Sequence, residues 1–356
     1  MNKSFSDNIL AWYEDFGRHD FPWQQEKTPY RVWVSEIMLQ QTQVATVIPY
    51  YTRFMDRFPT IQSLADAEED VVLHLWTGLG YYARARNLQK TAQIIQQQYH
   101  GNFPDTVEAL TKLPGIGRST AGAIIAAAMN KRAVILDGNV KRVLCRYHCV
   151  EGWPDQSRTS KKLWEIADNY TPQDRCADYN QAMMDLGASL CSRSKPACSL
   201  CPLNNECQAH MTNRTAEFPQ KKPKKKIPVK NTAMLVLVSP DGKNVLLEKR
   251  PPHGIWGGLW SLPEIPADET PESFLLVNGL KQKGKAESWQ ALRHTFSHFH
   301  LDIKPILINL QKSPGSIREK GRWHWYELAN PSQVGLAAPV KNLLLLLESS
   351  LNEESA

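Results

Sequence analysis

Four of the seven cysteines fall in one short stretch, at Cys191, Cys198, Cys201 and Cys207. Intervals of six, two and five residues separate them, so only Cys198 and Cys201 form a close pair. Four thiolates in one loop can hold a zinc ion or a [4Fe–4S] cluster. Structural zinc sites usually present two close pairs, whereas clusters tolerate irregular loops. The loop therefore predicts a metal or cluster site rather than four free thiols, and its chemistry leaves zinc and iron–sulfur open.

Two carboxyl groups, Glu36 and Asp137, stand where they could share acid and base chemistry. Glu36 lies among apolar residues such as Val34 and Met38 on an expected helix, where burial would raise its pKa. Asp137 precedes the polar stretch 138–142. One carboxyl group kept neutral can donate a proton, while an ionised one stabilises positive charge. The alternatives are that Glu36 is a surface residue and that Asp137 only caps the following helix.

A tight turn lies between these carboxyl groups in the chain. The segment Asp105–Lys112 suits a short helix with Asp105 as its N-terminal cap, and Arg118–Met129 suits a second helix rich in alanine. Gly115 and Gly117, with a proline before them, form the turn. This is a helix–hairpin–helix pattern, whose free backbone N–H groups can bind an anion such as a nucleic-acid phosphate. A turn without a ligand is the alternative.

The elements that must position these residues are helical over the first two hundred residues. Apolar or small residues recur at helical spacing from Val34 through Met38 and Gln41 to Ile48. Further helical patterns cover Val71–Trp76, Leu88–Tyr99, Val107–Leu113 and Lys162–Ile166.

The composition changes in the middle of the chain. Residues 213–232 contain three prolines and a run of lysines, which suits an extended linker. Beyond it, strand-like and helical stretches predict an α+β domain. They are Ala233–Val238, Val245–Lys249, Phe299–Leu310 and, for the helix, Pro339–Leu351. We therefore predict a helical domain over 1–212, a linker over 213–232 and a second domain over 233–356.

Charge and hydropathy narrow the class of protein. The net charge of +6 is concentrated in the linker, since Phe218–Lys230 contains six lysines and no acidic residue. Any nucleic-acid footprint in the folded parts must therefore be a local basic patch. Purely apolar runs such as Leu343–Leu347 are far too short to cross a membrane, and the N-terminus lacks the apolar core of a signal peptide. A cytoplasmic protein is expected.

Several motifs together resemble the endonuclease III superfamily of DNA glycosylases and, within it, the adenine DNA glycosylase family. The resemblance covers essentially the whole chain. Its motifs are Val34–Thr46, Leu75–Asn87, Leu113–Gly122, Ile135–Val143, Asn180–Gly187, the cysteine loop, Trp256–Leu259 and Arg293–His300.

The resemblance implies a fold and a cofactor. The first domain would be a mainly α helix–hairpin–helix glycosylase domain, with a six-helix core over about 21–131 and a cluster-bearing part formed by 1–20 and 132–212. The second would be an α+β Nudix-like domain. The family favours a structural [4Fe–4S] cluster on the four cysteines, shaping a loop in which Arg193 and Lys195 contact DNA.

The resemblance also implies the chemistry. Glu36 would protonate adenine and later help to activate water, and Asp137 would stabilise the oxocarbenium-like sugar. Relatives that also cut the strand carry a lysine where this chain has Ser119, and a serine cannot form the Schiff base. A monofunctional glycosylase that leaves an abasic site is therefore expected.

DNA contacts follow from the same motifs. The target base must leave the stack, and side chains must fill the gap. Gln41, Leu79 and Tyr81 match the positions that the family inserts beside the flipped base. Asn139 and Gln181 are weaker pocket candidates, and Gly115, Gly117 and Ser119 belong to the expected DNA-contacting turn.

The second domain would recognise 8-oxoguanine opposite the adenine, through Ser297 and His298 in a loop with Phe296. Phe296 could equally pack in a core. The helix that holds magnesium in Nudix hydrolases is missing after Gly258, so pyrophosphohydrolase activity is not expected. The expected partner is duplex DNA with A·8-oxoguanine or A·G mispairs. We expect a monomer without a membrane partner, associated with the nucleoid when bound to DNA.

Three other functions remain open from the sequence: a bifunctional pyrimidine-lesion glycosylase, a noncatalytic iron–sulfur DNA-binding protein and a nucleotide hydrolase. Ser119 and the second domain argue against the first, and the carboxyl pair argues against the second.

Overall fold

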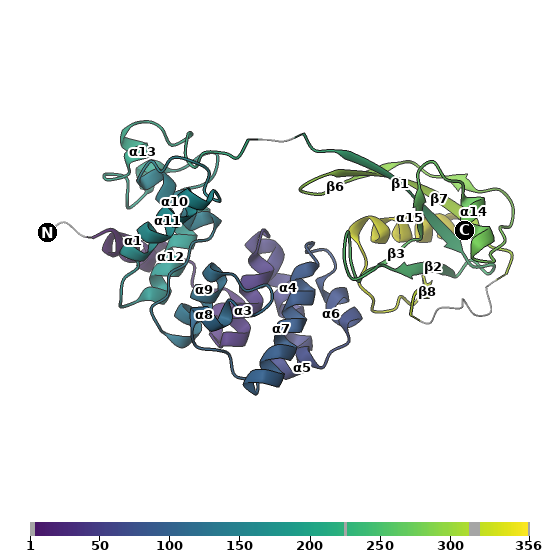
Figure 1. Cartoon of the computed structure of the whole chain (residues 1–356), viewed down its shortest axis with the longest axis horizontal. Coiled ribbons are helices and arrows are strands. Elements are labelled where there is room, and N and C mark those ends of the chain that lie inside the picture. Colours follow the sequence, from purple (N-terminus) through teal and green to yellow (C-terminus); the bar gives the residue numbers. More distant parts are fainter. Residues whose placement is uncertain (1–3, 224–225, 313–320, 355–356) are drawn as a thin grey trace. The chain divides into compact units, whose positions relative to one another are not determined.

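The computed structural model describes residues 4–223, 226–312 and 321–354. Parts of the predicted domains and linker, at 1–3, 224–225, 313–320 and 355–356, lie outside this description. The chain divides into two compact units. The first comprises Met1–Asp66 and Asn87–Lys224, and the second comprises Ala67–Arg86 and Lys225–Ala356. Figure 1 shows that the first unit is helical and that the second is built around a sheet.

Helices build the first unit, in an order that begins with α1 (Phe5–Phe16), α2 (Pro22–Gln25), α3 (Pro29–Leu39), α4 (Val44–Arg57) and α5 (Ile61–Ala65). It continues with α7 (Ala83–Tyr99), α8 (Val107–Leu110), α9 (Arg118–Met129), α10 (Gly138–Tyr147), α11 (Ser157–Tyr170), α12 (Cys176–Ser189), the short 3₁₀ helix η1 (Cys198–Leu200) and α13 (Gln208–Met211). The first turn of α7 belongs to the second unit, and the rest of the helix belongs to the first.

Small residues allow the helices of the first unit to approach one another closely. On α9, a Cβ added at Gly122 would lie 2.2 Å from the carbonyl oxygen of Val134. On α12, a Cβ at Gly187 would lie 2.6 Å from the Cβ of Asn139, next to the start of α10. Both contacts are far closer than van der Waals distance. Glycine at these two positions therefore sets how near Asp137 and its neighbours come to α9 and α12.

The helical pattern predicted from Val34 to Ile48 is not one helix. The chain leaves α3 after Leu39 and resumes as α4 at Val44, with Gln41 between them at a φ of 58°. Ala45, which lies within this pattern, is exposed. The residues that α4 buries are Val47, Tyr51, Phe54 and Met55. The apolar periodicity of the sequence therefore continues across the turn that separates the two helices.

The predicted cap of the helix before the hairpin is also wrong. Thr106, not Asp105, caps α8, because its Oγ1 accepts a hydrogen bond of 3.3 Å from the backbone N–H of Ala109. The Asp105 carboxylate is instead 2.5 Å from Nζ of Lys131. The helix ends at Leu110, whereas Arg118–Met129 forms α9 as predicted.

In the part of the second unit that the structure describes, eight strands form a mixed sheet. The elements of this unit are α6 (Glu69–Trp76), β1 (Val229–Val238), β2 (Asn244–Lys249), β3 (Trp260–Ser261), β4 (Glu264–Pro266), α14 (Pro271–Val277), β5 (Glu287–Ser288), β6 (Leu292–Thr295), β7 (His300–Asn309), β8 (Trp323–Glu327) and α15 (Ala338–Glu354). The main path runs β3-β2-β1-β7-β5, and β1 and β7 pair in parallel over their whole length.

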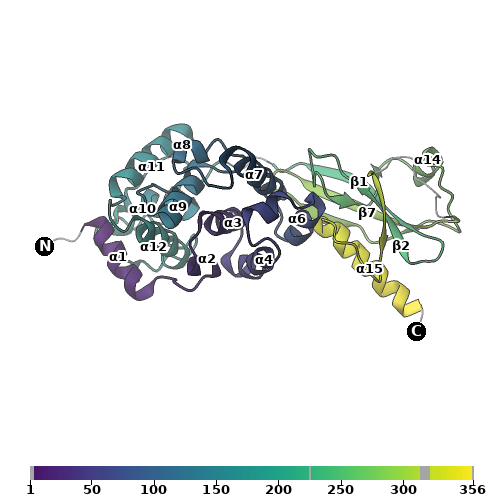
Figure 2. The ribbon, with the colours of Figure 1, turned by 90° about the horizontal axis from the view of Figure 1, so that it is seen from below.

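Both faces of the central strand β1 are covered. Alternate residues such as Leu235 and Leu237 belong to a core cluster with Leu275 of α14. The intervening Met234 and Val236 are fully buried on the opposite face. Figure 2 shows α15 along the face opposite to α14. A strand buried on both faces explains why Ala233–Val238 reads as a continuous apolar run.

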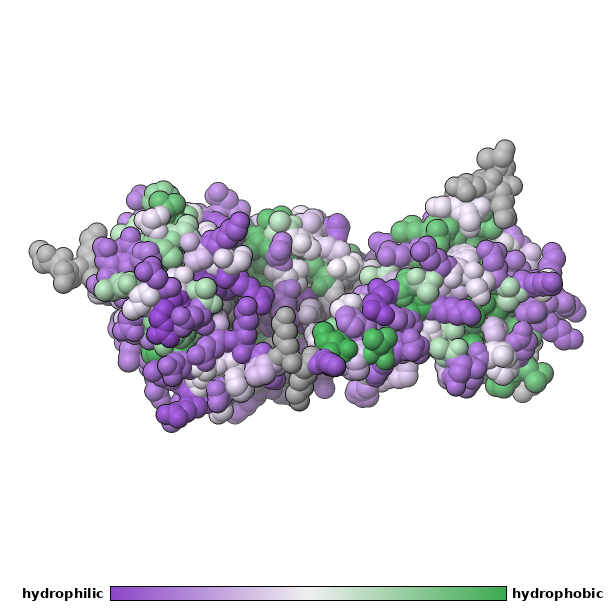
Figure 3. Space-filling view, turned by 90° about the horizontal axis from the view of Figure 1, so that it is seen from above, coloured by the Kyte–Doolittle hydropathy of each residue, from purple (hydrophilic) through white to green (hydrophobic). Residues whose placement is uncertain are grey.

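The face in Figure 3 is mainly hydrophilic, with apolar residues in small separate groups. Among the described residues, none of the helices is both long and apolar enough to span a bilayer.

The predicted linker is shorter in the structure than the sequence indicated. Within it, Phe218 is buried in the core of the first unit and Val229 already begins β1.

Candidate active site

A cavity of about 480 Å³ in the first unit brings together residues from helices far apart in the sequence. Its lining includes Glu36, Gln41, Ser119, Asp137, Asn139 and Gln181. All six are residues that the sequence singled out. The volume falls within the range of small-molecule pockets. One cavity therefore combines the carboxyl groups of Glu36 and Asp137 with amides and a hydroxyl.

The sequence of α3 explains why Glu36 faces this cavity. Thr28 caps the helix by accepting a hydrogen bond from the N–H of Arg31, and Pro29 occupies its first turn, where no N–H is needed. The helix buries a continuous apolar face that includes Trp33 and Ile37. Glu36 is half-buried and lines the cavity.

Burial and, as the smaller cause, the negative charge of Asp137 together raise the pKa of Glu36 to about 8. A carboxyl group in this position keeps its proton at neutral pH. Glu36 is thus the proton donor of the pair.

Asp137 is the N-terminal cap of α10, as one interpretation of the sequence predicted, and it also lines the cavity. Its Oδ1 accepts a hydrogen bond of 2.8 Å from the N–H of Val140, and its Oδ2 accepts one of 3.2 Å from Nδ2 of Asn139. Burial raises the pKa of Asp137, and these two donors oppose that rise together with the charge of Arg142. Because these contacts favour the ionised form, Asp137 is the better candidate for the carboxylate.

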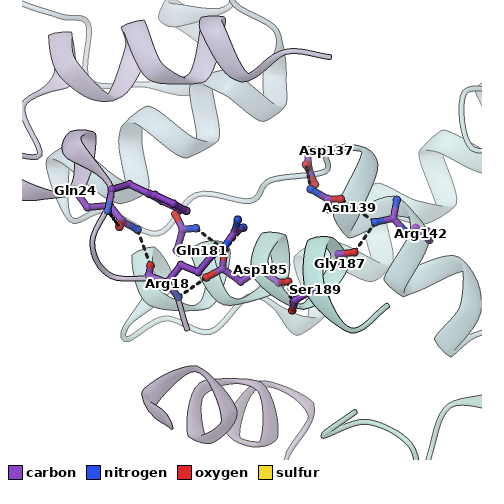
Figure 4. A network of polar contacts seen from close by, with 10 residues as sticks. Arg18, Gln24, Asp137, Asn139, Arg142, Gln181, Asp185, Gly187 and Ser189 are labelled. Atoms are coloured by element: carbon purple, nitrogen blue, oxygen red, sulfur yellow. Dashed lines mark hydrogen bonds and ion pairs between the residues drawn. The ribbon is translucent and has the colours of Figure 1, made fainter. Parts of the chain in front are cut away.

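The contacts of Asp137 continue through Asn139 to Arg142 (Figure 4). The guanidinium of Arg142 donates to Oδ1 of Asn139 at 2.8 Å and to the carbonyl oxygen of Gly187 at 2.6 Å. It also donates to the carbonyl oxygen of Cys191 at 2.7 Å. One arginine therefore connects the Asp137 end of the cavity with the first cysteine.

A second polar network, also drawn in Figure 4, was missed by the sequence reasoning. The carboxylate of Asp185, only 2% exposed, accepts hydrogen bonds from Nε and Nη2 of Arg18 at 2.9 and 2.6 Å. It also accepts one of 2.9 Å from Nε2 of Gln181. Arg18 and Gln181 both line the cavity. The available signal was an acidic residue beside Met183 and Leu186 on an apolar helix.

Ser119 lies on the cavity wall in the first turn of α9. Its Oγ accepts a hydrogen bond of 3.0 Å from the N–H of Leu136, the residue before Asp137. The preceding turn has Gly115 at a φ of 79° and Gly117 as N-cap residue. Gly117 has no side chain that could cap the first amides of α9. These amides are suited to an external anion.

Leu79 and Tyr81 belong to the second unit, unlike the residues of the cavity. Leu79 is buried, whereas Tyr81 is 51% exposed at a φ of 49°. In the same unit, Ser297 and His298 are exposed at the tip of the β6–β7 hairpin. Phe296 stacks on Phe299 at 4.5 Å between ring centres. Phe296 thus packs beneath the hairpin tip and is less exposed than Ser297 and His298.

The four cysteines gather at the edge of the first unit's core. Cys191, Cys201 and Cys207 pack against it. Burial, with smaller contributions from the neighbouring cysteines Cys191, Cys207 and Cys198, raises the pKa of Cys201 to about 12. Among the described residues, no group of three or more Cys, His, Asp or Glu side chains is placed to hold a metal ion. As thiolates these four side chains would repel one another, and a cationic iron–sulfur core would offset that repulsion.

Arg146 holds the cysteine loop and was not singled out by the sequence. It is 3% exposed and donates to the Sγ of Cys191 at 3.3 Å. It also donates to the carbonyl oxygens of Ser192 and Arg193, at 2.8 and 3.1 Å, and to that of Phe218 at 3.0 Å. A buried arginine among apolar residues of α10 was the available signal.

Comparisons with known proteins agree with this geometry. Residues 34–169 match the HhH-GPD superfamily of base excision DNA repair proteins, and residues 233–346 match the NUDIX domain. The adenine DNA glycosylase of Buchnera aphidicola subsp. Acyrthosiphon pisum (strain APS) is 43% identical over 341 residues, covering 96% of both chains. The chain belongs to the adenine DNA glycosylase family. The human adenine DNA glycosylase is 35% identical, over 94% of this chain and 72% of its own length.

Solved structures support the fold of this glycosylase. A thermostable thymine-DNA glycosylase superposes with a TM-score of 0.54 at 28% identity, covering 58% of this chain and 95% of its own. An endonuclease III–DNA complex matches with a TM-score of 0.50 at 22% identity and covers 58% and 94%, which speaks for the fold alone. The predicted fold class is confirmed. The protein is an enzyme of base excision repair that acts on DNA.

The raised pKa of Glu36 predicts a pH-dependent stability difference for Glu36→Gln. The folded protein holds this proton up to about pH 8, against 4.5 for the ordinary group. The contribution of protonated Glu36 to the free energy of unfolding is therefore fully present below pH 4.5 and is lost as the pH rises through 8. Glutamine does not ionise, so the variant should gain free energy of unfolding over the wild type between about pH 5 and pH 8, then level off.

Chemical denaturation across this pH range measures the difference. Glu165→Gln, which removes an exposed carboxyl group of the same unit, is the matched control and should follow the wild type. A Glu36→Gln difference that is independent of pH would show that Glu36 is not desolvated.

Proposed function

We propose that this enzyme is a monofunctional glycosylase that hydrolyses the N-glycosidic bond of adenine paired with 8-oxoguanine, and also of adenine in A·G mispairs. The observation that carries the proposal is the carboxyl pair, Glu36 and Asp137, on the wall of one cavity. Their environments differ in the direction that the reaction needs, because the donors around Asp137 favour its ionised form while burial keeps Glu36 protonated.

In the proposed reaction, the adenine leaves the stack and enters the cavity. Glu36 donates its proton to the base, which makes the base a better leaving group. The C1′–N9 bond breaks, and its electron pair stays with the adenine. The carboxylate of Asp137 stabilises the positive charge that develops on the sugar. Glu36, now ionised, accepts a proton from the water that attacks the sugar.

The strand stays intact because the cavity wall has a hydroxyl where a lyase needs an amine. Ser119 carries no nitrogen for a Schiff base, and its Oγ is already engaged by the N–H of Leu136. The product is an abasic site. The amides of the Gly115–Gly117 turn and the first turn of α9 are suited to hold a backbone phosphate during the reaction.

The opposite base would be read by the second unit. Ser297 and His298 at the tip of the β6–β7 hairpin are exposed, and their hydroxyl and imidazole groups can hydrogen-bond to a base edge. The packing of Phe296 under the tip keeps these two side chains at the surface. The remaining proposals are that Gln41, Leu79 and Tyr81 fill the space left by the flipped base, and that the enzyme acts as a cytoplasmic monomer on mispaired duplex DNA.

We also propose a [4Fe–4S] cluster on Cys191, Cys198, Cys201 and Cys207. When bound, it would supply a structural centre that fixes the loop, without taking part in base release. Arg146 already fixes the loop from the inside through its carbonyl oxygens. The loop residues Arg193 and Lys195 would then present positive charge to the DNA backbone.

Base release from matched duplexes tests the proposed function. Duplexes with A·8-oxoguanine, A·G and A·T are incubated with the full chain and analysed with and without alkali. The adenine strand should be cut only after alkali, fastest opposite 8-oxoguanine and slowest opposite thymine. Asp137→Asn should bind the same duplexes yet release adenine about 10²- to 10⁴-fold more slowly.

Other outcomes separate the alternatives. Equal release from all three duplexes would contradict recognition of the opposite base. Cutting without alkali would contradict the role of Ser119. Binding without any release would favour a noncatalytic DNA-binding protein.

Iron analysis tests the proposed cofactor. The purified chain should contain about four iron atoms with matching acid-labile sulfide. Cys198→Ser should lower both, whereas Cys145→Ser, at a buried thiol outside the loop, should leave them unchanged. Stoichiometric zinc without iron would contradict the proposal.

A further inference from the structure

The segment Ala67–Arg86 is part of the second unit, although it lies between helices of the first in the sequence. Its helix α6 packs against the end of the sheet domain. A Cβ at Gly335 would lie 2.5 Å from the Cβ of Leu73, and one at Gly258 would lie 3.8 Å from Cδ1 of the same leucine. Leu73 is fully buried. Glycine 335 thus allows the helix to approach the backbone of the C-terminal part directly.

Polar contacts also attach α6 to the C-terminal part of the second unit. Nζ of Lys249 lies 3.0 Å from Oδ1 of Asp70, and Nε1 of Trp260 donates to Oδ2 of Asp70 at 3.2 Å. The ring Nδ1 of His74 is 3.2 Å from the carbonyl oxygen of Val334. These contacts tie successive turns of α6 to β2, β3 and the segment before α15.

Hydrogen bonds connect both ends of the loop that follows α6 to Leu336, in the C-terminal part of the second unit. The N–H of Leu336 donates to Oγ1 of Thr77 at 3.4 Å, and its carbonyl oxygen accepts a hydrogen bond of 2.9 Å from the hydroxyl of Tyr82. Thr77 and Tyr82 flank the residues Gly78–Tyr81. Both backbone groups of Leu336 therefore hold the two ends of this loop.

The loop itself has a defined conformation. Gly78 and Gly80 have φ values of 108° and 69°, which favour glycine, and Tyr81 has a φ of 49°. The indole Nε1 of Trp76 donates to the carbonyl oxygen of Gly80 at 3.1 Å. A left-handed tyrosine is uncommon and persists only where its surroundings fix it. This conformation presents the Tyr81 ring to solvent, at 51% exposure.

We propose that Thr77 and Tyr82 are positioning residues that clamp the loop Gly78–Tyr81 onto Leu336, so that the C-terminal part fixes how the exposed ring of Tyr81 enters DNA. This inference rests on the proposed function, in which Tyr81 helps to fill the gap beside the flipped adenine. The exposed tip Ser297–His298 belongs to the same compact unit as the loop. Recognition of the opposite base by Ser297 and His298 is therefore coupled to insertion of the loop Gly78–Tyr81, because both segments belong to one compact unit.

Tyr82→Phe tests the clamp, with Tyr30→Phe as its matched control. Both hydroxyl groups donate to a backbone carbonyl, that of Tyr30 to Phe58 at 2.8 Å, and both side chains are 8% exposed. Hydrogen exchange in the free full chain should accelerate about threefold to tenfold at the amides of residues 78–82 in Tyr82→Phe, and should be unchanged there in Tyr30→Phe.

Single-turnover base release gives the second readout. Tyr82→Phe should slow release from A·8-oxoguanine about threefold to tenfold and from A·G less, so that the ratio of the two rates falls. Tyr30→Phe should leave this ratio unchanged. If the wild type is active but Tyr82→Phe matches Tyr30→Phe in exchange and in the ratio, the clamp is wrong. A wild type that releases no adenine overturns the proposed function instead, and the exchange data still report on the loop.

Discussion

Burial of one carboxyl group next to a second is the constraint on which the first unit depends. Removing Glu36 from water favours its protonated form, and the charge of Asp137 acts in the same direction. Two ionised carboxylates in this cavity would repel each other and lack hydration. The arrangement is stable because Asp137 takes the available donors, from Val140 and Asn139, and leaves Glu36 to hold the proton.

This asymmetry depends on how closely the helices approach. Gly187 brings α12 against Asn139, and Gly122 brings α9 against the backbone that leads to Asp137. Any side chain at either position would push this backbone away and loosen the donors around the carboxylate. The same closeness lets Arg142 reach from Asn139 to Cys191. The catalytic chemistry and the cysteine loop therefore share one set of packing contacts.

Local sequence patterns predicted much of this arrangement, where the cause is local. The helix Arg118–Met129 and the strand Ala233–Val238 followed from spacing and composition. The grouping of Glu36 with Asp137, which are far apart in the sequence, followed from the motif resemblance. Distant pairings outside these motifs could not be predicted from local patterns. Arg18 and Asp185 are 167 positions apart, and their ion pair exists only because α1 and α12 pack side by side. The attachment of α6 to the C-terminal part was missed for the same reason, since Asp70 and Lys249 carry no local sign of each other.

The central claim is that Glu36 holds its proton at neutral pH because it is buried beside Asp137. Carbon-13 NMR of glutamate carboxyl groups, with Glu36→Gln used to assign the signal, measures this directly. We expect a titration midpoint of about 8 in the wild type and a lower one in Asp137→Asn, where the neighbouring charge is removed. A midpoint near the ordinary value of 4.5 in the wild type would contradict this claim.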